Sequence, residues 1–169
     1  VHEAGIKELN KPRRFLKVVR PISLSRGDKR IAVYPSDHFK VTYSISFDHP
    51  LLRHQSRTQR LTEGSFIEEI APARTFGFLE DVDRMRAAGL GLDDSLKNVV
   101  VVDGAKVLND DGLRFKDEFV RHKILDCVGD LYLCGGPILG RVKAHKTGHY
   151  FNNKLLRKLF AKRSAWRWA

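Results

Sequence analysis

Cysteine is scarce in this sequence. Cys127 and Cys134 are the only two among 169 residues, and no Cys-x-x-C pair is present. They lie seven positions apart in one stretch, which is too far for a disulfide within a helix. The sequence therefore offers no disulfide framework. We expect both cysteines to be plain apolar residues of a protein in a reducing compartment.

Long apolar runs are absent as well. No segment offers the roughly 20 consecutive apolar residues that a bilayer-spanning helix needs. The first residues do not resemble a secretory signal, because charge begins at Glu3 and no apolar stretch follows. The sequence starts at Val1, in what looks like the middle of a helix and without an initiator methionine. We therefore interpret the chain as a fragment of a longer protein.

Acidic residues are too few to balance the basic ones. The chain has 31 Lys and Arg against 20 Asp and Glu, a net charge of +11, which attracts nucleic acid, anionic lipid or polyphosphate ligands. No nucleic-acid partner is expected, because the sequence shows no aromatic cluster on adjacent strands, no zinc knuckle and no helix-turn-helix spacing. We interpret the basic segment 154–168 as a terminal helix packed on the domain. The alternative is a helix that lies on an anionic membrane surface.

The order of the predicted elements favours an α+β fold, with helices on one face of a mainly antiparallel sheet. Early strands follow one another as hairpins, and the polar stretch 48–60 is predicted to be a loop. Ser65-x-x-Glu68 has the pattern of a capping box, so a helix is expected to start near Phe66. Strands are expected at 15–22, 29–34, 39–47, 99–102, 106–108 and 138–144, and further helices at 79–88, 115–133 and 149–162.

The segment 115–133 organises the chain. His122, Asp126 and Asp130 are spaced four residues apart. On a helix each is therefore turned only about 40° from the last. Lys123 lies beside them. We interpret this polar face as half of a zinc site, although a surface ion pair has the same spacing and two ligands do not complete a site. The apolar residues expected on the opposite side are Val120, Ile124, Leu125, Val128 and Leu131.

Two shorter segments also carry groups suited to catalysis. In Lys146-Thr-Gly-His149, the histidine opens a helix, where a nearby carboxylate such as Asp130 would keep its ring protonated as a general acid. A histidine that only caps the helix is the alternative. In Ala73-Arg-Thr-Phe-Gly-Phe78, a hydroxyl between aromatic residues is placed to point into a cleft, and an ordinary strand is the alternative.

Three segments together resemble one enzyme family: ARTFGF (73–78), VLNDDGLRFKDEFVRHKILDCVGDLYL (107–133) and KTGHYFNNKLL (146–156). The sequence is similar to the UDP-3-O-acyl-N-acetylglucosamine deacetylases, zinc amidases of lipid A biosynthesis in Gram-negative bacteria. The pattern HK-x-x-D-x-x-GD-L is the most specific part, and the resemblance covers essentially the whole chain. It implies a cytoplasmic enzyme of two similar domains, each a sheet packed on helices, with zinc between them.

The resemblance also implies how the chain is divided. Residues 1–13 would be the tail of the first domain and a linker, and 14–162 the second domain. A β-α-β insert would occupy about 76–103, and 163–169 would be a C-terminal tail. His122 and Asp126 would be two of three zinc ligands. The third, a histidine directly after a catalytic glutamate, belongs to the first domain and is absent here.

Roles for the remaining site residues follow from the same resemblance. Lys123 would lie beside the zinc, His149 would act on the leaving amine while Asp130 orients it, and Thr75 would stabilise the oxyanion. Substrate contacts are implied for the uracil at Phe47, for the diphosphate at Lys29 and Lys146, and for an apolar acyl passage at Phe76, Phe78, Val82, Gly91, Leu96 and Val101.

The expected function is therefore zinc-dependent hydrolysis of the N-acetyl group of UDP-3-O-acyl-N-acetylglucosamine. The expected partners are this substrate, the missing N-terminal domain and, peripherally, the inner face of the inner membrane. The isolated chain is expected to be inactive because it carries half of the active site. A module that binds nucleic acid or a membrane surface without catalysis is the alternative.

Overall fold

One long strand holds the large sheet together. In the computed structural model, this strand, β9 (Ile138–His145), pairs parallel with β1 (Leu16–Val18) and β4 (Phe39–Ile45) and antiparallel with β3 (Lys29–Tyr34). The antiparallel partners β2, β5 and β10 bring the sheet to seven strands. The mainly antiparallel α+β fold is thus confirmed. The structure describes residues 3–5, 7, 9–81, 84 and 97–169. The added strands span Ile22–Arg26 (β2), Gln55–Arg60 (β5) and Trp166–Trp168 (β10).

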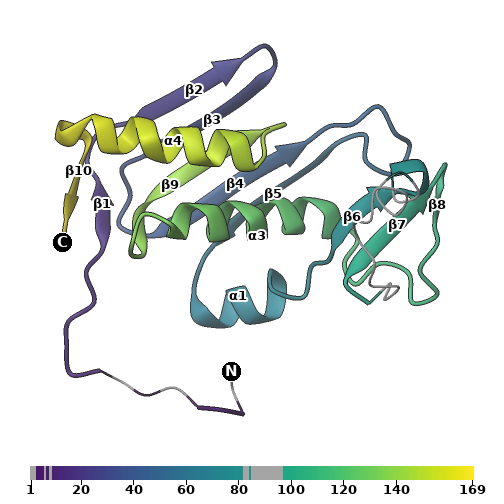
Figure 1. Cartoon of the computed structure of the whole chain (residues 1–169), viewed down its shortest axis with the longest axis horizontal. Helices are drawn as coiled ribbons and strands as arrows, with labels where there is room; N and C mark the ends of the chain where they lie inside the picture. The colour runs from purple at the N-terminus through teal and green to yellow at the C-terminus, as the bar shows by residue number, and fades with distance from the viewer. Residues whose placement is uncertain (1–2, 6, 8, 82–83, 85–96) are drawn as a thin grey trace.

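Two helices, α3 (Glu118–Tyr132) and α4 (His149–Ala161), lie side by side on one face of this sheet (Figure 1). Helix α4 contacts β2 and β3, and α3 contacts β4 and β5. Every second residue of β9 is buried, as expected for a strand with one face under helices. The core between the two layers is apolar; its largest fully buried side chains include Tyr43, Phe119, Ile124, Leu155 and Leu159.

Burial on α3 leads to a matched prediction. Ile124 is fully buried on this helix, whereas Ile67 on α1 (Glu63–Glu69) is 40% exposed. We expect Ile124→Val to lower the free energy of unfolding by about 0.5–1.5 kcal/mol, because a buried methylene is lost. Ile67→Val should change it by less than about 0.5 kcal/mol. Urea unfolding with an unchanged m-value measures both, and equal effects would contradict the assigned core.

A small second sheet lies beyond the N-terminal end of α3 (Figure 1). Strands β6 (Thr75–Phe78) and β7 (Val99–Asp103) pair in parallel, and β8 (Lys106–Val107) pairs antiparallel with β7. A parallel pair requires a crossover connection, and the β-α-β insert predicted at 76–103 includes such a connection. Residues 79–81 begin a helix, and most of the helix predicted at 79–88 lies outside the described residues.

Three local predictions were wrong. The single strand predicted at 15–22 is two strands, because β1 ends at Val18 and β2 begins at Ile22. The polar stretch predicted to be a loop contains β5, which pairs with β4 along its whole length. Its sequence, QSRTQR, lacks apolar alternation because its side chains lie mostly in solvent or in ion pairs. Helix α1 (Glu63–Glu69) starts three residues earlier than predicted, because Thr62 is the N-cap. The Thr62 hydroxyl accepts from the Ser65 backbone N–H, and the Ser65 hydroxyl accepts from the Thr62 backbone N–H.

The C-terminal residues join the fold. Strand β10 pairs antiparallel with β1, from Leu16 opposite Trp168 to Val18 opposite Trp166. Trp166 is only 7% exposed, and the guanidinium of Arg163 lies 4.6 Å from the centre of its ring. Helix α4 buries its apolar face, as the favoured interpretation of the basic segment requires. The helix predicted over 154–168 nevertheless ends at Ala161, and a 3-10 turn (Arg163–Ala165) and β10 follow it. Among the described residues, no helix is long and apolar enough to cross a membrane.

Candidate functional site

The polar face of α3 carries the predicted ligand pair. His122 Nε2 lies 3.2 Å from Asp126 Oδ1, and the two side chains are 15% and 14% exposed. The opposite side of the helix is buried at Val120, Ile124 and Leu131, as predicted. Leu125 and Val128, also predicted there, are only partly buried, because they lie at the edge between the core and an open groove.

The ring of His122 is held by a backbone carbonyl. Its Nδ1 lies 3.3 Å from Ala73 O. Because a carbonyl oxygen only accepts, Nδ1–H donates to it in the tautomer that leaves Nε2 unprotonated. Asp126 Oδ1, 3.2 Å from Nε2, also only accepts, so a cation between Nε2 and Oδ1 would satisfy both atoms. Burial lowers the pKa of His122 below its ordinary value, more than the nearby Asp126 carboxylate raises it. The ring is therefore neutral at pH 7, which is the state that a metal ligand requires.

Lys123 and Phe76 lie beside this pair. Lys123 Nζ is 3.2 Å from Asp126 Oδ2 and 5.7 Å from the centre of the Phe76 ring. Phe76 also meets His122 and Phe47 edge to face, at centroid distances of 6.3 and 6.1 Å. The site thus combines a cation, a carboxylate and an imidazole against aromatic walls. Such walls exclude water and strengthen electrostatic interactions.

His149, the first residue of α4, faces the same pair from the neighbouring helix. Its Nδ1 lies 2.7 Å from Asp130 Oδ2, and its Nε2 lies 3.9 Å from Asp126 Oδ2. Asn152 Nδ2 donates to the same Asp130 oxygen at 2.8 Å. Sequence reasoning missed Asn152, although its position three residues after His149 places it on the same helix face. Asp130 therefore orients His149 and is itself fixed.

A cleft of about 1000 Å³ adjoins the site. The predicted substrate residues Lys29, Phe47 and Lys146 line it together with Lys123 and His149. The Lys146 backbone is in the left-handed region (φ 52°). Its Nζ pairs with Asp28 at 2.7 Å. Arg26 adds a cation that the sequence did not single out. The cleft is thus predominantly basic, with two exposed aromatic rings, those of Phe47 and Tyr150.

Other predicted site residues lie outside this cleft. Thr75 is exposed at the start of β6, two residues after the carbonyl that contacts His122. Phe78 stacks against His49 at 5.0 Å between ring centres. Val101 is 5% exposed within β7. The remaining predicted lining residues, Val82, Gly91 and Leu96, lie outside the described residues.

A buried ion pair next to the site was not found from the sequence. Arg74 and Glu118 have side chains only 1% and 0% exposed, and Arg74 Nε donates to Glu118 Oε1 at 2.9 Å. Arg74 also donates to Asp111 and to the Gly112 carbonyl. Burial alone would raise the pKa of Glu118, but hydrogen bonds from Arg74 and from the Arg114 backbone hold it below its ordinary value.

This pair makes stability pH-dependent. Glu118 binds a proton less readily in the folded state than in the unfolded chain. The stabilisation that ionised Glu118 gives the folded state is therefore complete above the ordinary pKa of 4.5, and it is lost as pH falls through the lower folded pKa. We expect the urea midpoint to fall between about pH 6 and about pH 3. Glu118→Gln should show a smaller fall over the same range. An identical fall in the variant would contradict this assignment.

The residues present fit part of a zinc site. A neutral imidazole and a carboxylate on one helix face are ligands that Zn²⁺ accepts, and the second ring nitrogen of His122 has the carbonyl partner typical of such ligands. Among the described residues, no group of three or more His, Cys, Asp or Glu is arranged to hold a metal. Since a catalytic zinc takes three protein ligands, the pair needs a further donor.

Comparison with known proteins agrees with this chemistry. Residues 1–161 match the family model for UDP-3-O-acyl N-acetylglycosamine deacetylase. The chain is 47% identical over 168 residues to a UDP-3-O-acyl-N-acetylglucosamine deacetylase of Hahella chejuensis, covering 98% of this chain and 56% of the relative. A relative of the same name from Pseudoalteromonas translucida is 49% identical over 172 residues, covering 100% and 56%. The chain thus spans about half the length of these curated relatives, and it belongs to the UDP-3-O-acyl N-acetylglycosamine deacetylase family.

Proposed function

We propose that this chain supplies half of the active site of a zinc-dependent deacetylase that removes the N-acetyl group of UDP-3-O-acyl-N-acetylglucosamine, the committed step of lipid A biosynthesis. The observation that carries the proposal is the 3.2 Å approach of His122 Nε2 to Asp126 Oδ1 beside a basic cleft. Membership of the family and the names of the relatives support the substrate class.

His122 and Asp126 would hold the zinc, with a histidine from the missing first domain as third ligand. Bound zinc supplies activation of water at neutral pH and polarisation of an amide carbonyl. The neutral ring of His122, with Nδ1–H donated to Ala73 O, leaves Nε2 free for this purpose. Lys123, 3.2 Å from Asp126, would contact anionic parts of the substrate.

His149 would act as the general acid of amide hydrolysis. Breaking the C–N bond requires a proton on the leaving nitrogen, and a positioned imidazolium delivers it. Asp130 accepts from Nδ1 at 2.7 Å, which fixes the orientation of the ring and leaves Nε2 directed toward Asp126. The exposed hydroxyl of Thr75 would donate to the oxyanion as negative charge develops there.

The cleft suits a nucleoside diphosphate sugar. Phe47, 38% exposed, would stack on uracil, and Lys29 and Lys146 would contact the diphosphate. Acyl-chain contacts are proposed for the small sheet and the insert that follows β6. Their residues are Phe76, Phe78 and Val101, with Val82, Gly91 and Leu96 outside the described part of the chain.

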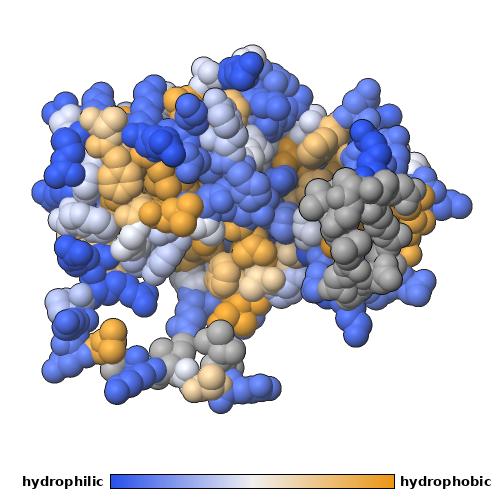
Figure 2. Space-filling model, in the orientation of Figure 1, coloured by the Kyte–Doolittle hydropathy of each residue, from blue (hydrophilic) through white to orange (hydrophobic). Residues whose placement is uncertain are grey.

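An open apolar face marks where the missing half would pack. Figure 2 shows apolar side chains over α1 and where α3 and α4 lie side by side. A groove of about 1370 Å³ runs between α1, α3 and residues of the N-terminal segment, and Phe66, Leu125, Val128 and Tyr132 are among the residues that line it. We propose that the first domain covers it, with residues 1–13 as its tail and linker and 14–162 as the second domain. Residues 163–169 would be the C-terminal segment that ends in β10.

The site of action is proposed to be the cytoplasm, at the inner face of the inner membrane. An acylated substrate is held near a bilayer, and the net charge of +11 favours contact with anionic lipid.

The test uses the chain alone and a completed protein, defined as this chain fused to the part of the Hahella chejuensis relative that its match leaves uncovered. We expect the chain alone to bind zinc weakly and to lack activity, because two ligands leave the site open. The completed protein should bind one zinc and release acetate from UDP-3-O-acyl-N-acetylglucosamine. Activity of the isolated chain near that of the completed protein would contradict the shared site.

A further inference from the structure

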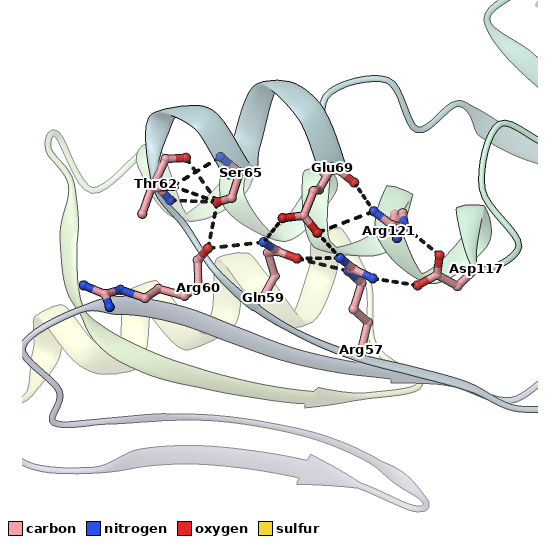
Figure 3. A network of polar contacts seen from close by, with 8 residues as sticks. All are labelled: Arg57, Gln59, Arg60, Thr62, Ser65, Glu69, Asp117 and Arg121. Atoms are coloured by element: carbon pink, nitrogen blue, oxygen red, sulfur yellow. Dashed lines mark hydrogen bonds and ion pairs between the residues drawn. The ribbon is translucent and has the colours of Figure 1, made fainter.

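The segment that leads into β6 is held along α3 at successive backbone atoms. Arg121 Nη1 donates to Glu69 O at 2.7 Å, within the polar network of Figure 3, and Arg114 Nη1 donates to Pro72 O at 2.8 Å. The next two contacts involve Ala73 O and Arg74 N, which belong to one peptide bond. The segment is thus held to the helix directly beside the proposed zinc ligand.

This one peptide bond bridges Glu118 and His122. Arg74 N donates to Glu118 Oε1 at 3.0 Å, and Ala73 O accepts from His122 Nδ1 at 3.3 Å. A trans peptide is planar, and its N–H and C=O point in opposite directions. Glu118 and His122 are one turn apart on α3, so the peptide lies along the helix between them. Fixing the N–H at Glu118 therefore aims the carbonyl at His122.

Glu118 is itself held rigidly. Besides Arg74 N, its carboxylate accepts from Arg74 Nε at 2.9 Å, from Arg74 Nη2 at 3.2 Å and from Arg114 N at 2.6 Å. The far side of the Arg74 guanidinium donates to both Asp111 oxygens at 3.1 Å. Both partners of the ion pair are almost completely buried. A satisfied network of this kind in a low-dielectric interior has one preferred arrangement.

We propose that Arg74 and Glu118 are positioning residues of the metal site: they hold the 73–74 peptide so that its carbonyl selects the Nδ1–H tautomer of His122 and fixes the plane of its ring. This inference rests on the proposed function of His122 as a zinc ligand. Partners of ligating histidines tune metal affinity by about 10- to 100-fold when they are lost. Here the direct partner of His122 is a backbone carbonyl, which no side-chain substitution removes. The residues that orient this carbonyl are therefore those that hold the peptide, the buried pair Arg74 and Glu118.

The first readout needs no metal. In the 169-residue chain, long-range ¹H–¹⁵N correlation spectra report which ring nitrogen of His122 carries the proton, with the signal assigned by its absence in His122→Gln. We expect a measurable share of the Nδ1–H form in the unaltered chain, in competition with the Nε2–H form, which would donate to Asp126 Oδ1 3.2 Å away. In Glu118→Gln, a side-chain NH₂ group faces N–H donors that face a carboxylate in the unaltered chain. The 73–74 peptide should therefore rotate, and the population of the Nε2–H form of His122 should increase.

The second readout is zinc affinity of the completed protein, measured by chelator competition. Glu118→Gln should weaken it by about tenfold or more. The matched control is Asp117→Asn, the adjacent residue with the same chemistry. Its carboxylate binds Arg57 and Arg121 but not the 73–74 peptide (Figure 3). Asp117→Asn should leave the tautomer unchanged and zinc affinity within about twofold.

Several outcomes decide the inference. An unchanged His122 tautomer and zinc affinity in a folded Glu118→Gln variant would overturn it, as would equal effects of Asp117→Asn. If Glu118→Gln does not fold, Asp111→Asn replaces it, since this carboxylate is 63% exposed and still binds Arg74. Asp111→Asn should shift both readouts in the same direction by a smaller amount, and no shift would overturn the inference. A completed protein that binds no zinc would refute the proposed function, whereas the tautomer result would stand separately.

Discussion

Replacing His122 by alanine is expected to abolish tight zinc binding and deacetylation in the completed protein. His122 and Asp126 form the imidazole–carboxylate pair of α3, and Asp126 alone leaves a carboxylate next to Lys123. Loss of a direct ligand should weaken zinc affinity by more than the about 100-fold that loss of a ligand's partner causes. Zinc content after dialysis and acetate release under saturating substrate measure the two effects.

The control for this variant is His54→Ala. His54 is exposed in the turn before β5 and does not line the cleft. The control should retain one zinc per chain and full activity. Stoichiometric zinc in the His122→Ala protein would show that the ligand has been assigned to the wrong residue.

His149→Gln is expected to separate catalysis from metal binding. His149 approaches Asp126 only to 3.9 Å and is 68% exposed, so its loss should leave zinc affinity and folding nearly unchanged. A positioned general acid contributes about 10²–10⁴-fold to rate, and kcat should fall by that factor. Glutamine keeps a polar side chain but has no proton to deliver.

Two comparisons sharpen this test. Asp130→Asn should lower kcat less than His149→Gln, because the ring remains and only its orientation is less well fixed. His38→Gln, at an exposed histidine whose Nδ1 lies 3.3 Å from Arg60, should have no effect. A His149→Gln protein that loses zinc together with activity would indicate a ligand role and contradict the assignment.

Local patterns in the sequence were sufficient to predict which residues share the polar face of α3. Spacing of four residues placed His122, Asp126 and Asp130 together, and the structure adds that His122 and Asp126 are within 3.2 Å. The pairing of His149 with Asp130 was also predicted, because a helix N-terminus disfavours an imidazolium unless a carboxylate lies nearby. These contacts depend on helix geometry, which nearby residues determine.

Contacts between distant residues were not foreseeable. Arg74 and Glu118 are 44 positions apart, and β1 pairs with β10 from the opposite end of the chain. Strand β5 was missed because its residues are polar and its pairing with β4 comes from the backbone. The burial of Arg74 could not be predicted from the sequence either. A single arginine has the same sequence pattern whether its guanidinium group reaches solvent or a buried carboxylate.

The most direct test of a zinc site on α3 is anomalous diffraction at the zinc edge from crystals of the completed protein. The account predicts one peak about 2.0–2.1 Å from His122 Nε2 and about 2.0–2.2 Å from an Asp126 oxygen, with a third ligand from outside this chain. A zinc peak that contacts neither side chain, or a completed and active protein whose zinc lies elsewhere, would contradict it.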